Sequence, residues 1–430
     1  MPDHARARLR QATDLLGRLL KFELPADAAI DRFFKANRNM GARDRAFAAE
    51  TVYGCLRHMR ELQALYEPVH KPETTDARAA WLIAAWLLKF GGWSARALIQ
   101  AGFATDTVQL VERVRALDLF EFPLAVRANL PDWLTDSLCR QLGADETLKL
   151  ALALNQPAPV DIRVNASKLS REQLQSQLRT EGFELMPTPY SPYGLRREQR
   201  GPLFASRAFR SGLFELQDEG SQLIGLLSGV RPGQQVVDFC AGAGGKTLQM
   251  AAMMGNTGAI YAFDVVRRRL DRLRPRLLRA GVHTVQRRVI LDEGDPALAR
   301  LVAKADVVLV DAPCSGTGTL RRNPDIKWRP IDLAGLSALQ SRILGSAARL
   351  VKPGGRLVYA TCSLLEEENC GVTSVFLAAH QDFKVLPASE ILVRQGISVP
   401  GGQAADGALE LLPHRHNTDG FYALVMQRTA

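Results

Sequence analysis

Two cysteines stand shortly after apolar segments of the kind that forms buried β-strands. Cys314 follows ADVVLVD (305–311), and Cys362 follows GRLVYAT (355–361). In an open α/β sheet the carboxyl ends of the strands form the ligand crevice, and consecutive strands usually lie side by side. We therefore expect both thiols, 48 residues apart, to face one pocket together with the carboxylate of Asp311. A lone cysteine is usually a small buried apolar residue, but this setting favours a chemical role for the pair.

A glycine-rich turn follows another apolar segment. QQVVDF (234–239) leads into CAGAGGKT (240–247), which contains three glycines that allow the backbone to approach a ligand closely, namely Gly242, Gly244 and Gly245. The spacing matches neither G-x-G-x-x-G nor the Walker pattern. A glycine turn between strand and helix is weak evidence when taken alone. We expect a cofactor loop here, with Cys240 lining the site.

Two aspartates strengthen this prediction. Asp264 closes the second strand, where an acidic side chain can accept hydrogen bonds from ribose hydroxyls, and Asp292 follows the third strand, near the position of an adenine amine. The alternative for either is an aspartate that caps a turn or helix. No nearby feature is suited to phosphates, which favours S-adenosylmethionine over a dinucleotide.

A thiol beside S-adenosylmethionine suits one reaction in particular. Carbon 5 of a pyrimidine has no lone pair, but a thiolate added to carbon 6 makes carbon 5 a nucleophile that can take the methyl group. A base then removes the proton from carbon 5, and the thiolate leaves. Because a free thiol is only slightly ionised at neutral pH, it needs activation by the sulfonium, by Lys246 or by helix N-termini. The target base must also leave its stack.

The elements that position these residues alternate between strand and helix. Five apolar runs begin at residues 234, 259, 285, 305 and 355, with helical segments between them, which predicts a parallel sheet covered on both faces. Before it, a segment within 150–225 reads strand, helix and strand, with Ser170 as N-cap and Gly182 as C-cap. Arg163 and Asn165, near the end of its first strand, could meet a ligand or simply terminate the strand.

Residues 1–145 are predicted to be helical throughout. An apolar stripe recurs every three to four residues at Phe47, Thr51, Cys55, Met59, Leu62 and Tyr66. Five basic residues lie mostly off that stripe and form either a solvated face or an RNA contact: Arg43, Arg45, Arg57, His58 and Arg60.

Composition places limits on location and partners. The 430 residues carry 55 Lys+Arg against 45 Asp+Glu, a net charge of +10 that favours an anionic partner such as nucleic acid, although many enzymes are equally basic. Six cysteines form no C-x-x-C pair, so we expect no metal site, no disulfides and a reducing cytoplasm. We expect Cys55, Cys139 and Cys370 in the core. The apolar run 79–88 is far shorter than the about 20 residues of a membrane span, and no secretory signal is visible.

The motifs resemble those of the Nop/Sun family of RNA 5-methylcytosine methyltransferases, in particular its RsmB-like branch. The matching segments are DAPCSGTGTLRRNPDIKW (311–328), ATCSLLEEEN (360–369), LPHRHNTDGFYAL (412–424) and LFELQDEGSQL (213–223). The resemblance implies a Rossmann-like α/β methyltransferase domain at 226–430. It is preceded by a small α/β segment at 150–225 that is expected to contact RNA, and by an all-α NusB-like RNA-recognition domain at 1–145.

The resemblance also implies residue roles. Cys362 would be the nucleophile, Cys314 would assist release of the covalent adduct, and Asp311 and Lys246 would position the cytosine and handle protons. The implied cofactor contacts are Cys240, Ala241, Gly242, Ala243, Gly244, Gly245, Lys246, Asp264, Arg269, Asp292 and Asp311. One departure is CAGAGGKT where the family commonly reads CAAPGGKT, and the absence of the proline should loosen the turn slightly.

The expected activity is methylation of a cytosine at carbon 5 in 16S ribosomal RNA, free or in an early small-subunit particle, by a monomer without a metal or membrane partner. Three alternatives remain open. A transfer RNA enzyme of the same family would share every catalytic motif. A DNA cytosine methyltransferase would not need the second thiol, and a non-catalytic ribosome-assembly protein would not need both thiols.

Overall fold

The computed structural model describes residues 2–103, 106–198 and 201–429. The chain divides into two compact units. The helical unit comprises Met1–Pro157 and Thr319–Pro330, and the α/β unit comprises Ala158–Gly318 and Ile331–Ala430. The predicted division into three domains at 1–145, 150–225 and 226–430 stays a proposal, because the contacts within the chain distinguish only these two compact units.

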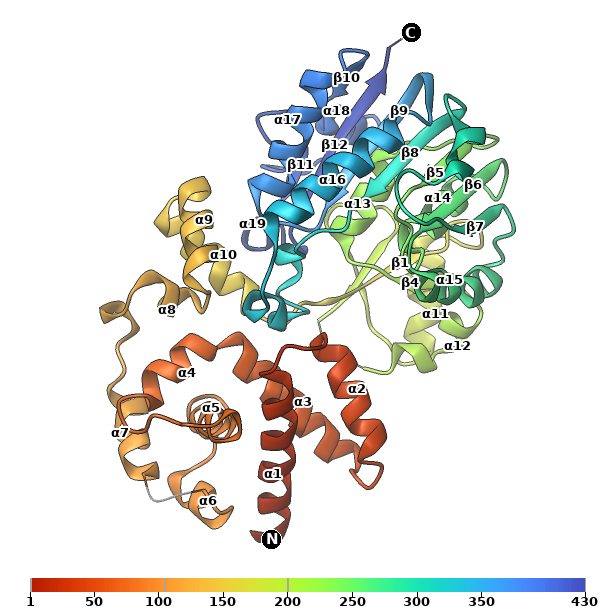
Figure 1. Ribbon diagram of the computed structural model, residues 1–430. Coiled ribbons are helices and arrows are strands. Elements are labelled where there is room, and N and C mark those ends of the chain that lie inside the picture. The colour runs from red at the N-terminus through yellow and green to blue at the C-terminus, as the bar shows by residue number, and fades with distance from the viewer. Residues whose placement is uncertain (1, 104–105, 199–200, 430) are drawn as a thin grey trace. The chain divides into compact units, whose positions relative to one another are not determined.

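The helical unit is built around α5 (Thr75–Lys89), which packs against α1, α3, α4 and α7 (Figure 1). Its apolar run is buried, with Leu82, Ile83 and Leu87 fully enclosed. The remaining helices are α1 (Pro2–Leu19), α2 (Ala26–Ala36), α3 (Ala42–Arg57), α4 (Met59–Tyr66), α6 (Ala95–Gln100), α7 (Thr107–Ala116), α8 (Leu124–Ala128), α9 (Asp132–Leu142) and α10 (Ala144–Leu154). In the part of the chain that is described, no helix is long and apolar enough to cross a membrane.

The predicted apolar stripe is buried except for Phe47, which is partly exposed, but it does not lie on one helix. Helix α3 ends at Arg57 and α4 begins at Met59, with His58 between them at φ −110° and ψ 22°. Arg57 is buried rather than on a solvated face, and its Nη2 donates to the carbonyl of Arg321 at 3.1 Å. The spacing alone indicated neither the break at His58 nor the burial of Arg57, because the apolar positions continue at intervals of three to four residues across the break.

The α/β unit begins with a four-stranded antiparallel sheet in the order β2-β3-β1-β4. Its strands are β1 (Val160–Val164), β2 (Met186–Pro187), β3 (Gly194–Arg197) and β4 (Phe214–Leu216), with α11 (Arg171–Thr180) and α12 (Arg207–Arg210). Ser170 forms the capping box of α11 with Gln173, and Gly182 adopts φ +83° after that helix, as the sequence predicted. This sheet is named the small sheet below.

The second sheet has the order β10-β12-β9-β8-β5-β6-β7, with β11 paired to β12. The strands β5 to β9 are parallel, and β10, β11 and β12 add antiparallel pairs. Their bounds are β5 (Gln235–Asp238), β6 (Ala259–Asp264), β7 (Val285–Val289), β8 (Ala305–Asp311), β9 (Val351–Thr361), β10 (Phe383–Leu386), β11 (Leu409–Leu411) and β12 (Phe421–Arg428). All five predicted strands are therefore confirmed.

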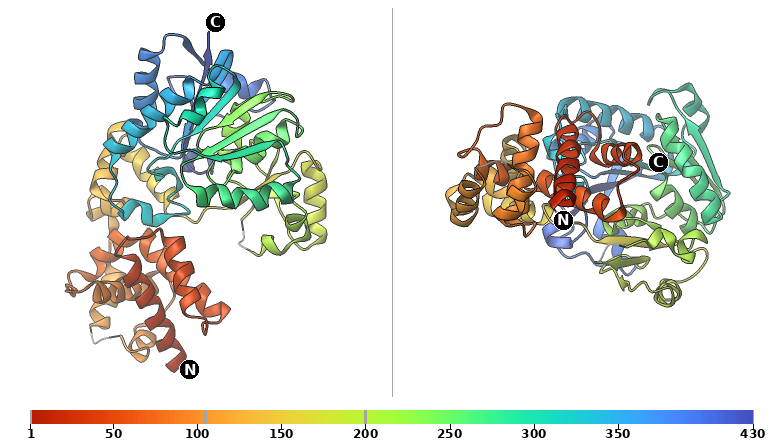
Figure 2. Two further views of the ribbon diagram at one scale, coloured as in Figure 1. Left: turned by 45° about the vertical axis from the view of Figure 1, so that its right-hand side comes forward. Right: turned by 90° about the horizontal axis from the view of Figure 1, so that it is seen from below.

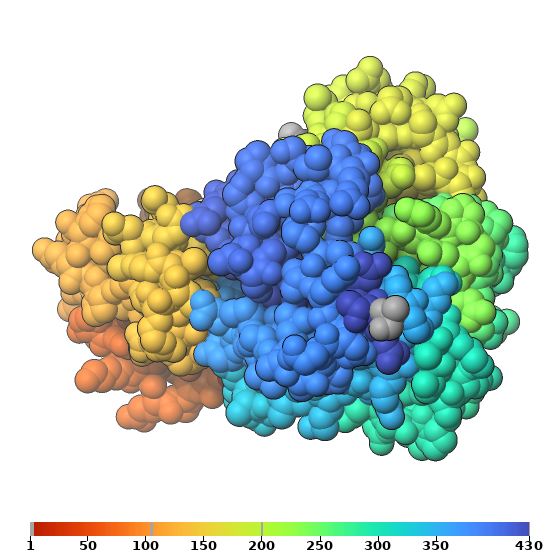
Figure 3. All heavy atoms as spheres, turned by 90° about the horizontal axis from the view of Figure 1, so that it is seen from above, coloured from red at the N-terminus to blue at the C-terminus, as the bar shows by residue number. Residues whose placement is uncertain are grey.

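Helices cover both faces of this sheet (Figure 2). Alternate residues of β8 point to opposite sides: Val308 and Val310 join a core with α16 and α17, whereas Val307 and Leu309 join a core with α13, α14 and α18. This alternation is the period of a strand buried on both faces. The helices are α13 (Glu219–Leu227), α14 (Gly245–Met253), α15 (Arg267–Ala280), α16 (Leu333–Ala348), α17 (Cys370–Ala379), α18 (Ala388–Val393) and α19 (Pro413–His416). In Figure 3 the C-terminal segments, in blue, gather beside the green segments that carry β5 to β7.

Candidate active site

The two thiols meet where the neighbouring parallel strands β8 and β9 end. Asp311 pairs in register with Ala360, and the loops beyond these residues carry the cysteines. The Sγ atoms of Cys314 and Cys362 lie 3.4 Å apart, and both residues are partly exposed. The strand order thus brings two residues 48 positions apart into direct contact.

The pair favours one retained proton. Two thiolates at this separation would repel each other strongly. The hydrogen bond with Cys362 and burial raise the pKa of Cys314 well above its ordinary value, and the negative charge of Glu368 acts in the same direction. Cys314 is therefore held as a thiol that can donate to the sulfur of Cys362.

A lysine and an aspartate form an ion pair at the same sheet edge. Lys246 Nζ, at the start of α14, lies 2.7 Å from Asp311 Oδ2, at the end of β8. The lysine side chain is 9% exposed and the aspartate side chain 35%, so the carboxylate is the partner more open to a ligand. Lys246 Nζ also lies 5.7 Å from the centre of the Phe421 ring.

The glycine loop has a conformation that demands glycine. Gly242 and Gly244 adopt φ +55° and +84°. A Cβ at Gly244 would lie 2.1 Å from Leu273 Cδ1. The carboxylate of Asp264 accepts from the N–H of Gly242 at 2.9 Å and from the N–H of Val266 at 2.7 Å. Asp264 therefore shapes the loop, while each of its oxygens can accept a further bond from a ligand hydroxyl.

The other expected cofactor residues differ in setting. Cys240 is partly exposed, and burial together with neighbouring carboxylates raises its pKa well above the ordinary value, which suits a lining residue better than a nucleophile. Arg269 is exposed in the first turn of α15. Asp292 is exposed and accepts from the N–H of Gly294 at 2.7 Å, which is the turn-capping alternative. Ala241 and Ala243 belong to the loop itself.

Three apolar side chains at the ends of β6 and β7 were not anticipated. Val265, Val266 and Leu291 are 56%, 39% and 83% exposed. They lie in the region where the sequence predicted the adenosine part of a cofactor, and exposed carbon surface there suits a flat aromatic base. Their positions just after two strand ends were the signal that could have revealed them.

Glu368 is the most consequential residue that the sequence did not single out. It lies in the short helical turn Glu366–Glu368, has no exposed surface and accepts from the N–H of Ser315 at 2.8 Å and from Gln340 Nε2 at 2.9 Å. Its other oxygen accepts from the hydroxyls of Ser315 and Ser363. Because these serines directly follow Cys314 and Cys362, one carboxylate holds both cysteine loops. In the sequence it is one of three consecutive glutamates, 366–368, and nothing local distinguishes it from its two exposed neighbours.

The remaining cysteines lie outside this cluster. Cys55 is buried, as expected, but Cys139 and Cys370 are only half-buried, since each lies on a helix with one open side. Across the residues that the structure describes, no three His, Cys, Asp or Glu side chains gather as a metal ion would require.

Comparison with known proteins agrees with this geometry. The model of a family described as 16S rRNA methyltransferase RsmB/F matches residues 226–427, and that of the RsmF/B-like ferredoxin-like domain matches 130–203. The chain is 32% identical over 429 residues to a probable ribosomal RNA small subunit methyltransferase B of Synechocystis, covering 92% of this chain and 94% of that protein. It is 31% identical to ribosomal RNA small subunit methyltransferase B of Thermus thermophilus, covering 90% and 89%.

A solved structure is also similar to this chain in sequence and fold. A methyltransferase homologue from Pyrococcus horikoshii is 29% identical with a TM-score of 0.61, covering 73% of this chain and 100% of that one. The mostly parallel sheet and the glycine loop define the class, a Rossmann-like methyltransferase with an N-terminal helical region. Within that class, the chain belongs to the RsmB/F family of the Nop/Sun methyltransferases, which confirms the resemblance seen in its motifs.

Proposed function

We propose that this protein methylates carbon 5 of a cytosine in 16S ribosomal RNA, with S-adenosylmethionine as methyl donor and a covalent adduct through Cys362. The coarser part, an RNA methyltransferase acting on small-subunit ribosomal RNA, follows from the family and its named relatives. The observation that carries the finer part is the contact of two thiols at 3.4 Å beside the glycine loop, because methyl transfer to nitrogen or oxygen needs no such pair.

Cys362, Cys314 and the Lys246–Asp311 pair have different roles in the proposed reaction. The Cys362 thiolate forms a bond to carbon 6, and the electrons of the 5,6 double bond make carbon 5 nucleophilic. S-adenosylmethionine, when bound, supplies the methyl group. The proton on carbon 5 then passes to a base, a role proposed for the carboxylate of the Lys246–Asp311 pair. The carbon–sulfur bond breaks and Cys362 leaves as thiolate. Cys314 keeps its proton beside that sulfur and assists release, while the Lys246–Asp311 pair positions the cytosine.

The proposed cofactor site is assembled from the same edge of the sheet. The loop from Cys240 to Lys246 would surround the methionine part, Asp264 would accept from the ribose, and Asp292 would lie near the adenine amine. Arg269 is proposed to contribute positive charge at the rim. The exposed carbon surface of Val265, Val266 and Leu291 supports an adenine ring in this place. The helical unit and the small-sheet segment are proposed to contact RNA.

The test distinguishes the reaction steps in which the two thiols act. Cys362→Ala should abolish methyl transfer and any covalent complex. Cys314→Ala should permit attack and transfer but stall release, giving an RNA adduct that survives denaturing gel electrophoresis and depends on S-adenosylmethionine. Cys139→Ala, a half-buried cysteine of α9, is the matched control and should behave as the unsubstituted protein.

Labelled S-adenosylmethionine offered with small-subunit ribosomal RNA, transfer RNA or DNA identifies the substrate. We expect label in carbon 5 of a ribosomal RNA cytosine only. Methylation of transfer RNA alone would replace the substrate assignment. If none of the three nucleic acids were methylated, the proposed enzymatic activity would be refuted. Adducts with the Cys362 variant but not with the Cys314 variant would exchange the two roles.

A further inference from the structure

Arg163, on β1 of the small sheet, is a buried cation with no carboxylate in hydrogen-bond contact among the described residues. It is 3% exposed, and its Nη1 donates to the carbonyl of Gly245 at 2.9 Å and to Oε1 of Gln217. Its buried Nε has no partner in the same described part of the chain. Burial lowers the pKa of Arg163 to about 9, with Glu215 opposing this and Arg276 adding to it. An enclosed charge with neutral partners opposes folding, so stability alone does not explain this residue.

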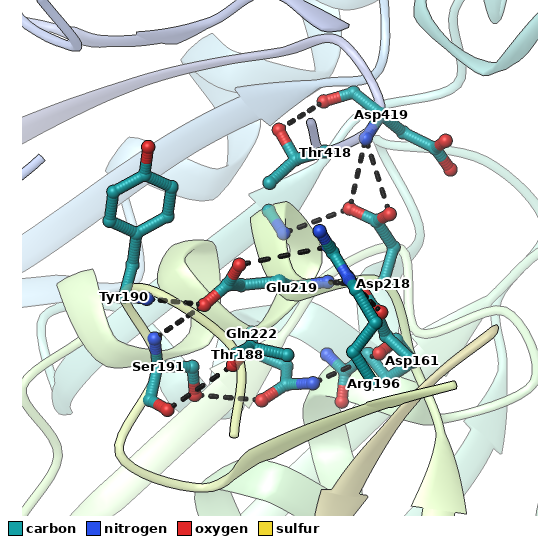
Figure 4. A network of polar contacts seen from close by, with 12 residues as sticks. Asp161, Thr188, Tyr190, Ser191, Arg196, Asp218, Glu219, Gln222, Thr418 and Asp419 are labelled. Atoms are coloured by element: carbon teal, nitrogen blue, oxygen red, sulfur yellow. Dashed lines mark hydrogen bonds and ion pairs between the residues drawn. The ribbon is translucent and has the colours of Figure 1, made fainter. Parts of the chain in front are cut away.

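A second arginine of the same sheet provides the contrast. Arg196, on β3, is also buried, but its guanidinium forms a two-point pair with Asp161 at 2.7 and 2.8 Å and lies 3.8 Å from Glu219 (Figure 4). That arginine is compensated in the ordinary way and belongs to a network joining the small sheet to α13. Its partners belong to β1 and α13 and not to the glycine loop. Two buried arginines on neighbouring strands therefore have different surroundings.

Arg163 is one of two arginines that bind carbonyls of the glycine loop. Arg276, on α15, donates from Nη1 to the carbonyl of Ala243 at 2.5 Å. Glu215, on β4 of the small sheet, accepts hydrogen bonds from Arg276 Nε at 3.1 Å and from Arg276 Nη2 at 2.9 Å. The small sheet thus acts on the loop twice, directly through Arg163 and through the Glu215–Arg276 pair.

The peptide bond transmits this contact to the ligand side of the loop. In a planar trans peptide, the carbonyl of one residue and the N–H of the next point in opposite directions. Fixing the Gly245 carbonyl therefore fixes the direction of the Lys246 N–H, which belongs to the first turn of α14 and has no partner within that helix.

We infer that Arg163 is a positioning residue for the cofactor, supported by Glu215 and Arg276, and that the small sheet is the element that sets the conformation of the cofactor loop. The inference rests on the proposed function, since it names what holds that same site. Arg163 itself contacts neither substrate nor cofactor.

The experiment compares Arg163→Met and Arg163→Lys with Arg196→Lys. Isothermal titration with S-adenosylmethionine and S-adenosylhomocysteine gives Kd without turnover. Both Arg163 variants should raise Kd and the KM for S-adenosylmethionine about tenfold, the effect expected for one hydrogen bond from a charged group. The kcat at saturating donor should stay within about twofold. The melting temperature of Arg163→Met should not fall, because an uncompensated buried charge is removed.

Arg196→Lys should lower the melting temperature and leave Kd unchanged. Wild-type Kd in both Arg163 variants would overturn the inference while leaving the proposed function intact. An equal rise in Kd for Arg196→Lys would also overturn it, since any damage to the small sheet would then suffice. If Arg163→Met does not fold, Arg163→Lys decides on the same criteria. Failure of the unsubstituted protein to bind S-adenosylmethionine would instead remove the proposed function and the inference with it.

Discussion

At the scale of single residues, Glu368 holds the two cysteine loops with one buried carboxylate. Glu368→Ala would leave the N–H of Ser315 without its acceptor in the interior, and the Gln340 amide would keep only the carbonyl of Pro313. We expect a decrease of about 3 kcal/mol in the free energy of unfolding. We also expect kcat to fall at least tenfold, because the thiols lose their common support, while Kd for S-adenosylmethionine stays unchanged.

The exposed neighbour Glu367 provides the control for this prediction. Urea unfolding, steady-state kinetics and cofactor titration on Glu367→Ala should reproduce the unsubstituted protein. If Glu368→Ala reduced stability but kept full kcat, the carboxylate would support the fold without organising the thiols.

A second residue, Asp238, links stability to pH. This carboxyl at the end of β5 is 1% exposed, and Oδ2 accepts from Thr247 Oγ1 at 2.6 Å. Burial, with the charges of Asp311 and Asp264 adding, raises the pKa of Asp238 to about 7. The folded state then holds the proton more tightly than the unfolded state, whose carboxyl ionises near pH ~4. The contribution of Asp238 to stability should therefore fall as pH rises from about 4 to about 7 and stay constant above that.

Asp238→Asn keeps the shape of the group and removes the titration. We expect the stability of this variant relative to the unsubstituted protein to increase between pH 5 and pH 8, measured by urea unfolding at both values. Asp271→Asn, at an exposed position of α15, is the control for the loss of one carboxylate by the same substitution. An identical difference at both pH values for Asp238→Asn would contradict a raised pKa.

At the scale of elements, α15 divides its arginines between two tasks. Arg276 and Arg279 pair with Glu215, so these two serve the structure of the α/β unit. Arg268 and Arg272 lie one turn apart, are exposed and form no ion pair within the described residues. Exposed guanidinium groups on one helical face suit phosphate contacts.

We predict that Arg268→Ala with Arg272→Ala weakens RNA binding and reduces its salt dependence. The slope of log affinity against log salt should become shallower by about 0.7 for each single-strand phosphate that the protein no longer neutralises, while Kd for S-adenosylmethionine is unchanged. Arg394→Ala, an exposed arginine paired with Glu390 on α18, is the control. An unchanged slope would exclude this face from RNA binding.

At the scale of the whole molecule, the helical unit is made from two distant stretches of chain. Lys327, from the second stretch, is 2% exposed and donates to the carbonyls of Arg57 at 2.8 Å and Asn129 at 2.7 Å and to Asn155 Oδ1 at 2.9 Å. Trp328 Nε1 donates to the carbonyl of Leu56 at 2.7 Å. Residues 319–330 therefore depend on the N-terminal helices for the partners of their buried groups.

Removal of residues 1–145 should leave binding of S-adenosylmethionine measurable, because the glycine loop and the residues that hold it belong to the α/β unit. RNA affinity and site choice should weaken if the helical unit serves recognition. The truncation also uncovers Lys327 and Trp328, so limited proteolysis should cut within 319–330 in the truncated protein and not in the full chain. Full activity with unchanged selectivity would contradict the recognition role.

Local patterns in the sequence determined the five parallel strands, the glycine loop, the capping box at Ser170 and the positions of Cys314 and Cys362 after strand ends. These features depend on side-chain period, backbone freedom and the order of neighbouring strands, all of which are written in short segments. The adjacency of the two thiols followed because consecutive parallel strands meet at one edge of the sheet.

Only the tertiary structure decided which charged residues are buried. No local pattern marks Lys327 or Glu368 as buried, and Arg163 stood out only by its place near a strand end. Each is enclosed and bonded to a group far away in the chain, at separations of 270, 53 and 82 residues. Burial of a charge depends on which distant segments supply its hydrogen-bond partners, because an enclosed charge is tolerated only where such partners converge. No local period or composition records that convergence, so the burial of these three residues and the identity of their partners emerged only from the folded chain.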